Sequence, residues 1–166
     1  EAEWEYASIG STQRRYPWGD SKPTCRNAVM TEGFKCDVWD RGGCGRKGTW
    51  TVGSKPAGRS WVGADDLAGN VEEWTNDWYR SYLDGPMTSP SVEVDPQGEK
   101  DGNTANWQRV VKGGSFNSCA LLLVSKLRQP TYDSIQDATL GFRCARPLIR
   151  PVQRGMGADT PPTDTR

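Results

Sequence analysis

Hydrophobic and polar positions follow a regular period in only a few short stretches of this chain. Residues 1–8 are good helix formers and predict the end of a helix, with Trp4, Tyr6 and Ala7 as candidates to pack inward. From residue 9 to residue 63 the period is lost, which predicts turns and loops. The pattern therefore indicates short regular elements joined by much irregular backbone.

Strand-like patterns are equally short. Residues 71–79 alternate, with Trp74 and Trp78 on one side, and predict a half-buried strand whose tryptophans belong to the core. Glycine and proline end the other candidates after a few positions. We expect further strands at 49–52, 109–112 and 141–145, a turn at 16–20, a strand or short helix at 121–127, and a long polar loop at 82–106.

Composition adds that the chain is globular although it is weakly hydrophobic. Only 34% of its 166 residues are hydrophobic, and the mean hydropathy is −0.76. Eight tryptophans and 19 glycines compensate, because tryptophan buries a large area per residue and glycine permits tight turns. The length suits one domain. The longest apolar run, residues 120–124, is too short for a membrane span, so we expect no transmembrane segment.

Charge and the absence of histidine exclude several classes of function. Lys plus Arg and Asp plus Glu number 21 each, and the chain contains no histidine. A Ser-His-Asp triad, a Cys–His pair and a histidine-ligated zinc site are therefore excluded. Zero net charge gives no global attraction to polyanions, which need a clustered positive surface, so we expect no nucleic-acid partner.

Five cysteines are present, and three of them cluster. Cys25, Cys36 and Cys44 lie in a loop-like stretch that offers little hydrophobic core, and a disulfide among them would stabilise it and imply an oxidising compartment. Free thiols in a cytoplasmic protein are the alternative. Zinc is disfavoured because no C-x-x-C spacing occurs. With an odd count, at least one cysteine is free or pairs outside the chain.

Six phrases occur in a specific order: EAEWEYA at 1–7, YPWG at 16–19, VGSKPAG at 52–58, DLAGNVEEWTNDWY at 66–79, RVVKGGSF at 109–116 and LGFRCA at 140–145. Together they resemble the sulfatase-modifying-factor family, the formylglycine-generating-enzyme-like domains. The resemblance implies an α+β, loop-rich variant of the C-type-lectin-like fold. It implies that residues 1–146 are the C-terminal portion of such a domain, with the N-terminal lobe missing or present as another piece. Residues 147–166 are rich in Pro and Arg and predict an extended or disordered tail.

The resemblance also raises the question of catalysis. The enzymes of this family bind copper(I) through two cysteines after the Gly-Gly-Ser phrase, and soft sulfur ligands select copper(I). Those positions are Ser118 and Leu123 here, and Cys119 stands one residue from the first. In a strand such an offset reverses the side-chain direction. We therefore expect no copper and no enzyme, with a copper-dependent formylglycine-generating oxidase of atypical cysteine arrangement as the alternative.

A structural calcium ion is implied at the turn between two carboxylates. In members of the family this turn supplies two side chains and two backbone carbonyls as ligands. The matching side chains are Asp66 and Glu73, and the matching carbonyls are those of Gly69 and Val71. Calcium prefers six to eight hard oxygen ligands and accepts carbonyls readily. We expect a calcium ion here.

A second calcium site of the family has a weaker match. Asn27 and Ala28 fit one half of that site, whereas the acidic position of the other half is Cys44. A disulfide at Cys44 would take over the stapling role of the ion in this loop.

The resemblance places a binding cleft near Ser115, Ser118, Arg128 and Arg143. These residues would contact a peptide or a glycan, but for two of them we favour the alternative that Arg143 ties down the final strand and Ser115 caps a turn. Taken together, the features predict a non-catalytic binding or structural subunit of an extracytoplasmic bacterial assembly. Its partners would be proteins, including its own N-terminal lobe. A lectin-like module that recognises glycan or peptide is a further alternative.

Overall fold

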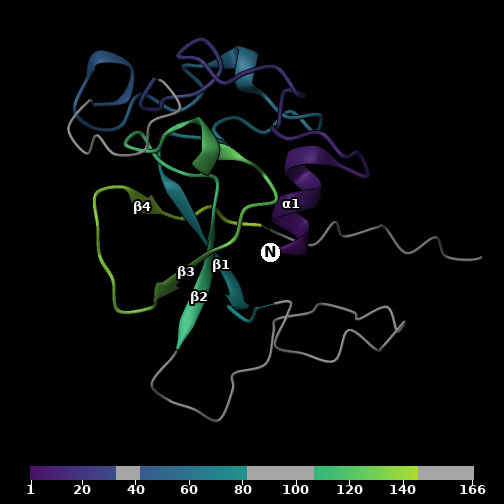
Figure 1. The fold of residues 1–166 in the computed structure, drawn as a ribbon, viewed down its shortest axis with the longest axis vertical. Helices are drawn as coiled ribbons and strands as arrows, with labels where there is room; N and C mark the ends of the chain where they lie inside the picture. The colour runs from purple at the N-terminus through teal and green to yellow at the C-terminus, as the bar shows by residue number, and fades with distance from the viewer. Residues whose placement is uncertain (33–41, 82–106, 146–166) are drawn as a thin grey trace, which may run out of the picture.

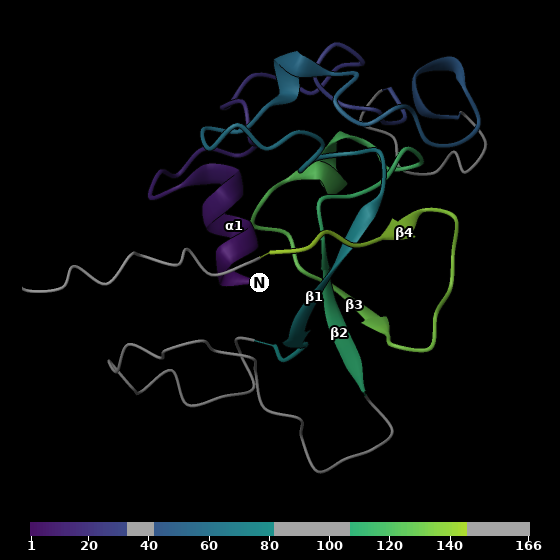
Figure 2. The ribbon, with the colours of Figure 1, turned by 180° about the vertical axis from the view of Figure 1, so that it is seen from behind.

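The described part of the protein combines one α-helix with a small mixed sheet beneath a thick layer of irregular loops (Figure 1). The computed structural model describes residues 1–32, 42–81 and 107–145. Seen from behind, the loops again lie together beyond one end of the strands (Figure 2). The elements are α1 (Ala2–Ile9), β1 (Glu72–Trp78), β2 (Gln108–Lys112), β3 (Gln129–Tyr132) and β4 (Leu140–Gly141), with 3-10 turns η1 (Gly43–Gly45), η2 (Pro56–Gly58) and η4 (Ala120–Leu123).

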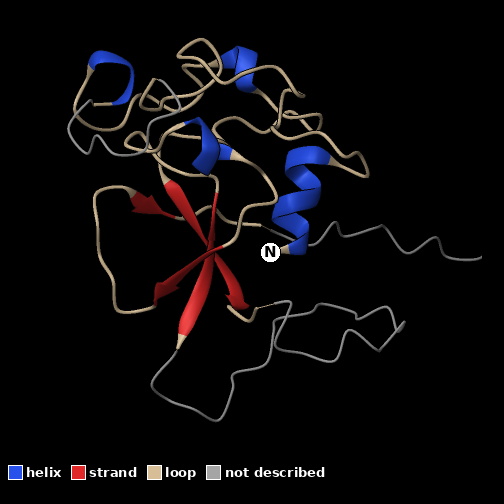
Figure 3. Cartoon of the chain, in the orientation of Figure 1, coloured by secondary structure: helices blue, strands red, loops and turns tan. Residues whose placement is uncertain are grey.

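The sheet has the strand order β3-β2-β1-β4, and its strands are short compared with the loops around them (Figure 3). β2 runs antiparallel to both β1 and β3, while β4 runs parallel to β1. Pro130 lies in β3, which is an edge strand of the sheet, where proline is tolerated. The register of β1 against β2 shifts between Trp74 and Trp78. This α+β, loop-rich architecture confirms the fold class expected from the sequence.

The predicted helix is confirmed, but one of its residues was assigned to the wrong side. Trp4 and Ile9 are buried, whereas Tyr6 is 56% exposed. A residue two positions from Trp4 points away from the face that Trp4 shares with its i+4 neighbours. Tyr6 instead meets the edge of Trp61, with ring centroids 5.1 Å apart. The helix therefore buries one narrow face.

The strand predictions are confirmed for 71–79 and 109–112 and wrong elsewhere. Residues 49–52 form no strand, because the backbone of Trp50 pairs with the side chain of Asn70 and not with another strand. The predicted strand at 141–145 contributes only Gly141 to β4. β3 was missed, since its proline argues against a strand in a single sequence. The 121–127 stretch begins within the η4 turn.

The buried face of β1 is the opposite of the one that the tryptophan pattern predicts. Glu73 and Asp77 are the buried side chains of the strand, at 4% and 8% exposure. Trp74 and Trp78 are only half-buried, so their assignment to the core is wrong. The inward carboxylate of Glu73 is tolerated because Trp4 and Arg143 donate hydrogen bonds to it.

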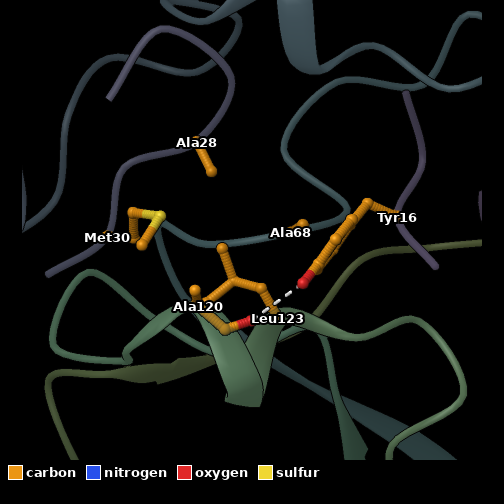
Figure 4. Close-up of a cluster of buried hydrophobic side chains, with 6 residues drawn as sticks. All are labelled: Tyr16, Ala28, Met30, Ala68, Ala120 and Leu123. Carbon is orange, nitrogen blue, oxygen red and sulfur yellow. Dashed lines mark hydrogen bonds between the residues drawn. The ribbon is translucent and has the colours of Figure 1, made fainter. Parts of the chain in front are cut away.

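The hydrophobic core lies between the loop layer and η4 (Figure 4). Its small side chains allow the loops to approach η4 closely, and the Tyr16 hydroxyl donates a hydrogen bond to the Ala120 carbonyl at 3.4 Å. Burial raises the pKa of Tyr16, an effect partly offset by the charge of Arg15. The buried cluster consists of Tyr16, Ala28, Met30, Ala68, Ala120 and Leu123.

The predicted disulfide is present in the loop layer. Cys25 and Cys44 are bonded, with their Cα atoms 5.5 Å apart, so the loop near residue 25 is tied to η1. Cys119 is also disulfide-bonded, and Cys144 is free and exposed. The third clustered cysteine, Cys36, lies outside the described residues.

Two further expectations fall outside the described ranges. The predicted long loop at 82–106 and the tail at 147–166 belong to parts of the chain that the structure does not describe. Within the described ranges, no helix has the length and apolar character needed to span a membrane.

Candidate functional site

The two positions that hold copper in the resembled enzymes lie in the turn and helix that follow β2. Ser118 is 4% exposed, and its hydroxyl accepts a hydrogen bond from the Ser115 backbone N–H at 2.9 Å. The Ser115 and Ser118 hydroxyl oxygens are 3.3 Å apart. Leu123 is fully buried in the core cluster. One position thus has a hydroxyl that closes a turn, and the other has no donor atom.

The neighbouring thiol group is not available as a substitute ligand. Cys119 is 1% exposed and disulfide-bonded, immediately before η4. A copper(I) site needs thiolate sulfur, and a disulfide sulfur carries no thiolate charge. An atypical oxidase would therefore require the Cys119 disulfide to be reduced first.

The predicted calcium turn is tightly connected to the rest of the fold. Asp66 and Asn70 both adopt positive φ, at 56° and 67°. The Asp66 Oδ2 accepts a hydrogen bond from the Gly53 backbone N–H at 2.7 Å. The Gly69 N–H donates to the Gly113 carbonyl at 3.0 Å, and the Asn70 N–H donates to the Val29 carbonyl at 2.8 Å. Hydrogen bonds to distant loops hold this turn in place.

The other predicted side-chain ligand, Glu73, is already satisfied. Its Oε2 accepts hydrogen bonds from Trp4 Nε1 and Arg143 Nε, each at 2.7 Å, and its Oε1 lies 2.5 Å from an Arg143 guanidinium nitrogen. Because Arg143 compensates the charge of this buried carboxylate, the Glu73 side chain does not fit the role of a calcium ligand. Asp66 and the carbonyls of Gly69 and Val71 stay the predicted ligands of this turn.

The second predicted calcium site coincides with the disulfide. Asn27 Oδ1 accepts a hydrogen bond from the Thr24 hydroxyl at 3.1 Å, and Asn27 Nδ2 donates to the Ala57 carbonyl at 3.2 Å. Ala28 is fully buried. Cys44 is bonded to Cys25 two residues before Asn27, so a covalent link joins the two halves of the site.

The predicted cleft residues divide into a pair and two separate arginines. Ser115 and Ser118 contact each other and are buried. Arg128 makes a two-pronged ion pair with Glu1, with distances of 2.6 and 3.0 Å, while Arg143 is paired with Glu73. These contacts agree with positioning roles: Arg143 ties the end of β4 to β1, and Ser115 closes a turn by accepting from the Asn117 N–H at 3.3 Å.

Two arrangements were missed by sequence reasoning because they join residues far apart in the chain. Lys112 is fully buried in β2, and its Nζ lies 3.1 Å from Glu5 Oε2 and 3.7 Å from Glu1 Oε1, which fastens α1 to the sheet. Trp50 lies beside two cations: Lys55 Nζ is 3.9 Å and Arg46 Cζ is 4.8 Å from its ring centroid. The sequence feature that could have predicted the Trp50 contacts is the spacing of aromatic and basic residues at 46–55.

One carboxyl on β1 titrates abnormally. Burial raises the pKa of Glu72, while a hydrogen bond from Gln129 Nε2 at 3.2 Å lowers it in part. The negative charge of Asp137 raises it further. The charged form of Glu72 is therefore destabilised in the folded protein. The charge of Glu73, in contrast, is paired with that of Arg143.

Residues 1–148 match the Sulfatase-modifying factor enzyme 1-like domain. The chain belongs to this family. With the observed loop-rich architecture, membership confirms the C-type-lectin-like fold that the sequence phrases implied.

Three relatives illustrate the range of this family. The chain is 38% identical to the formylglycine-generating enzyme of Thermomonospora curvata, over 87% of this chain and 47% of that protein. It is 35% identical to the serine/threonine-protein kinase pkn1 of Chlamydia caviae, over 88% of this chain and 20% of that protein. Among solved structures, Treponema denticola variable protein 1 aligns with a TM-score of 0.63 and 27% identity, over 85% of this chain and 44% of that one. The chain thus spans less than half the length of these relatives.

Proposed function

We propose that this domain is a catalytically silent member of the sulfatase-modifying-factor family that acts as a binding or structural subunit of an extracytoplasmic bacterial assembly. The observation that carries the proposal is the pair of residues at the copper positions, where Ser118 closes a turn and Leu123 fills the core. A serine hydroxyl is a hard ligand and leucine offers none, so these residues cannot form the two-thiolate site that copper(I) requires.

The state of the cysteines supports the same proposal. Cys119 is buried and oxidised in a disulfide, and Cys144 is an exposed free thiol on the segment after β4. Disulfides persist in oxidising compartments and are rare in the cytosol, which supports an extracytoplasmic location. The chain also matches a fifth of the length of a protein named as a kinase, so similarity to this chain is not confined to proteins named as formylglycine-generating enzymes.

The proposal includes a structural calcium ion, held by fewer residues than the sequence predicts. Asp66 and the carbonyls of Gly69 and Val71 would hold the ion, with water completing its oxygen shell. Bound there, calcium would stabilise the turn that enters β1. Glu73 stays with Arg143 in this arrangement.

The proposal is tested with the oxidised protein, copper(I) buffered by a competing chelator, and a cysteine-containing peptide under oxygen. We expect no aldehyde product and no copper(I) binding beyond that of the exposed thiol. The Cys144→Ser variant is the matched control, and copper captured by that thiol disappears in it. Copper(I) retained in Cys144→Ser, together with aldehyde in the peptide, would overturn the proposal. A Cys119→Ser variant then shows whether Cys119 is the ligand.

A further inference from the structure

An exposed apolar corner lies where α1 meets the loop at residues 59–65. Tyr6 of α1 is 56% exposed, and Trp61 and Val62 of the loop are each 48% exposed. The Tyr6 and Trp61 rings meet edge to face, with their centroids 5.1 Å apart. Single apolar residues are normal on a protein surface, whereas neighbouring ones form the kind of patch that contacts a partner. We call Tyr6, Trp61 and Val62 the aromatic corner.

The aromatic corner is held in place by its own contacts. Trp61 Nε1 donates a hydrogen bond to the Tyr6 carbonyl at 2.7 Å, and a Cβ at Gly10 would lie 3.1 Å from the Trp61 ring. The Ser60 backbone N–H donates to the Ala64 carbonyl at 2.9 Å, which closes the turn that carries Trp61. Because the rings are ordered before anything binds, covering them costs less entropy than covering mobile side chains.

The last described residues lie beside this corner. Arg143 Nε and Trp4 Nε1 both donate to Glu73 Oε2, each at 2.7 Å, so the Arg143 side chain lies next to α1. Arg143 also donates to the Asp65 carbonyl at 3.0 Å, and Asp65 follows Trp61 by four residues. In both views the yellow end of the chain, after β4, passes beside α1 (Figures 1 and 2). The chain therefore continues from a point near both elements that form the corner.

The sequence that follows has the chemistry to cover an apolar surface. Residues 146–154, RPLIRPVQR, contain three aliphatic side chains, three arginines and no acidic residue. Leu148, Ile149 and Val152 leave water only against an apolar neighbour, because so short a segment builds no core of its own. The two prolines restrict the backbone, which lowers the entropy lost on docking, and proline-rich segments dock on aromatic-lined surfaces in other proteins. We call residues 146–154 the C-terminal arm.

Reach and charge agree with docking of this arm on the corner. Four residues span at most about 14 Å and nine residues about 32 Å, so the arm is long enough to pass from Arg143 to Trp61. Glu3 is exposed and stands three residues before Tyr6 on α1, which places the two side chains on one helix face. Among the described residues Glu3 has no ion-pair partner. Its carboxylate is therefore available to an arginine of the arm.

We propose that the C-terminal arm docks on the aromatic corner of its own chain. Its aliphatic side chains cover the Tyr6 and Trp61 rings, and one of its arginines pairs with Glu3. A second copy of the chain, or a separate partner of similar chemistry, lacks the high local concentration that covalent attachment gives the arm. The proposal goes beyond the binding role proposed above and does not depend on the copper or calcium positions.

Contact quenching of a bimane label in the full chain tests this proposal. Cys144 is free and exposed, so the label is attached to Gln153→Cys in a Cys144→Ser background, and the Cys144→Ser chain alone measures background labelling. Tryptophan quenches bimane at short range. We expect the fluorescence to rise about twofold or more in Trp61→Phe, because a tethered segment occupies its site most of the time. Trp50→Phe is the matched control and should leave the fluorescence unchanged, since the segment after η1 lies across the loop layer from α1 (Figures 1 and 2).

A variant of the arm separates docking from simple tethering. Leu148→Ser/Ile149→Ser leaves the aromatic corner unchanged and should raise the fluorescence as Trp61→Phe does, because serine gains little from an apolar surface. Unchanged quenching in this variant would overturn the proposal, as would equal fluorescence of Trp61→Phe and the parent chain, with melting curves that show folded protein in each case. Quenching that disappears on dilution would assign the arm to a second copy and overturn docking within one chain.

Discussion

The side chain of Asn70 binds both polar groups of the Trp50 backbone. The Trp50 N–H donates to Asn70 Oδ1 at 2.9 Å, and Asn70 Nδ2 donates to the Trp50 carbonyl at 3.3 Å. The amide thus replaces the strand partner that Trp50 lacks. Because Asn70 stands just before β1 and the Trp50 ring lies against Lys55 and Arg46, this pair connects the sheet to the loop layer.

Substitution of Asn70 should therefore destabilise the whole loop layer. Asn70→Ala removes two hydrogen bonds at a site that is 5% exposed and places a Cβ-bearing residue without a side-chain polar group at φ 67°. We expect a loss of about 3 kcal/mol in the free energy of unfolding, from the unpaired Trp50 groups and the backbone strain. Asn70→Gly removes the same bonds but tolerates the backbone, and should lose less. Thermal melting that ranks glycine below alanine would contradict this account.

Removal of the Cys25–Cys44 disulfide should weaken the fold in a way that removal of the free cysteine does not. The bond joins residues 19 apart in sequence, and a loop of this size is stabilised by roughly 3 kcal/mol. Chemical denaturation of Cys25→Ser should show a loss of that order. Cys144→Ser is the control, since Cys144 is free and exposed. Equal stability of both variants and the wild type would remove the structural role assigned to this disulfide.

The Arg143–Glu73 pair should behave as a buried charge and its counterion. Arg143→Ala leaves the 4% exposed Glu73 carboxylate without its cation, and we expect a loss of about 2 kcal/mol, less than for a fully buried pair because Arg143 is 36% exposed. Adding Glu73→Gln to this variant should restore part of the stability, because a neutral amide needs no counterion. Urea denaturation of the two single variants and the double variant measures the coupling. Additive losses would show that the two residues do not stabilise each other.

Calcium should raise the melting temperature through the turn that precedes β1. An ion that binds only the folded state stabilises it by mass action, so a chelator should lower the melting temperature of the wild type. In Asp66→Asn the chelator should have little effect, because the proposed carboxylate ligand is lost. A melting temperature that is the same with calcium and with chelator in the wild type would exclude the ion from this turn.

The folding stability of the protein should depend on pH through Glu72. Its pKa is raised in the folded state, so folding favours the protonated form. The stability that this group contributes is present at low pH and falls as the pH rises through the folded-state pKa. Glu72→Gln should match the wild type near pH 4 and melt at a higher temperature at pH 7. A variant that is less stable than the wild type at pH 7 would contradict the burial argument.

Local sequence patterns predicted the elements that local residue preferences determine. The helix at residues 1–8 and the strands β1 and β2 follow from residue preferences and alternation, and they are where the sequence indicates. The clustering of cysteines likewise predicted a disulfide, although not that Cys25 would pair with Cys44. The strand expected at 49–52 is absent, because Trp50 is bonded to a residue twenty positions away. A pattern read over a few residues cannot contain that information.

The sequence by itself determined the family, the helix, the strands β1 and β2, and the residues at the copper positions, since each is a matter of residue identity and spacing. The tertiary structure decided which charges meet. It turned Glu73 inward to Arg143, and it placed Arg46 and Lys55 against the ring of Trp50. Pairing between residues distant in the chain depends on the closure of loops onto a common core, which leaves no periodic trace in the sequence.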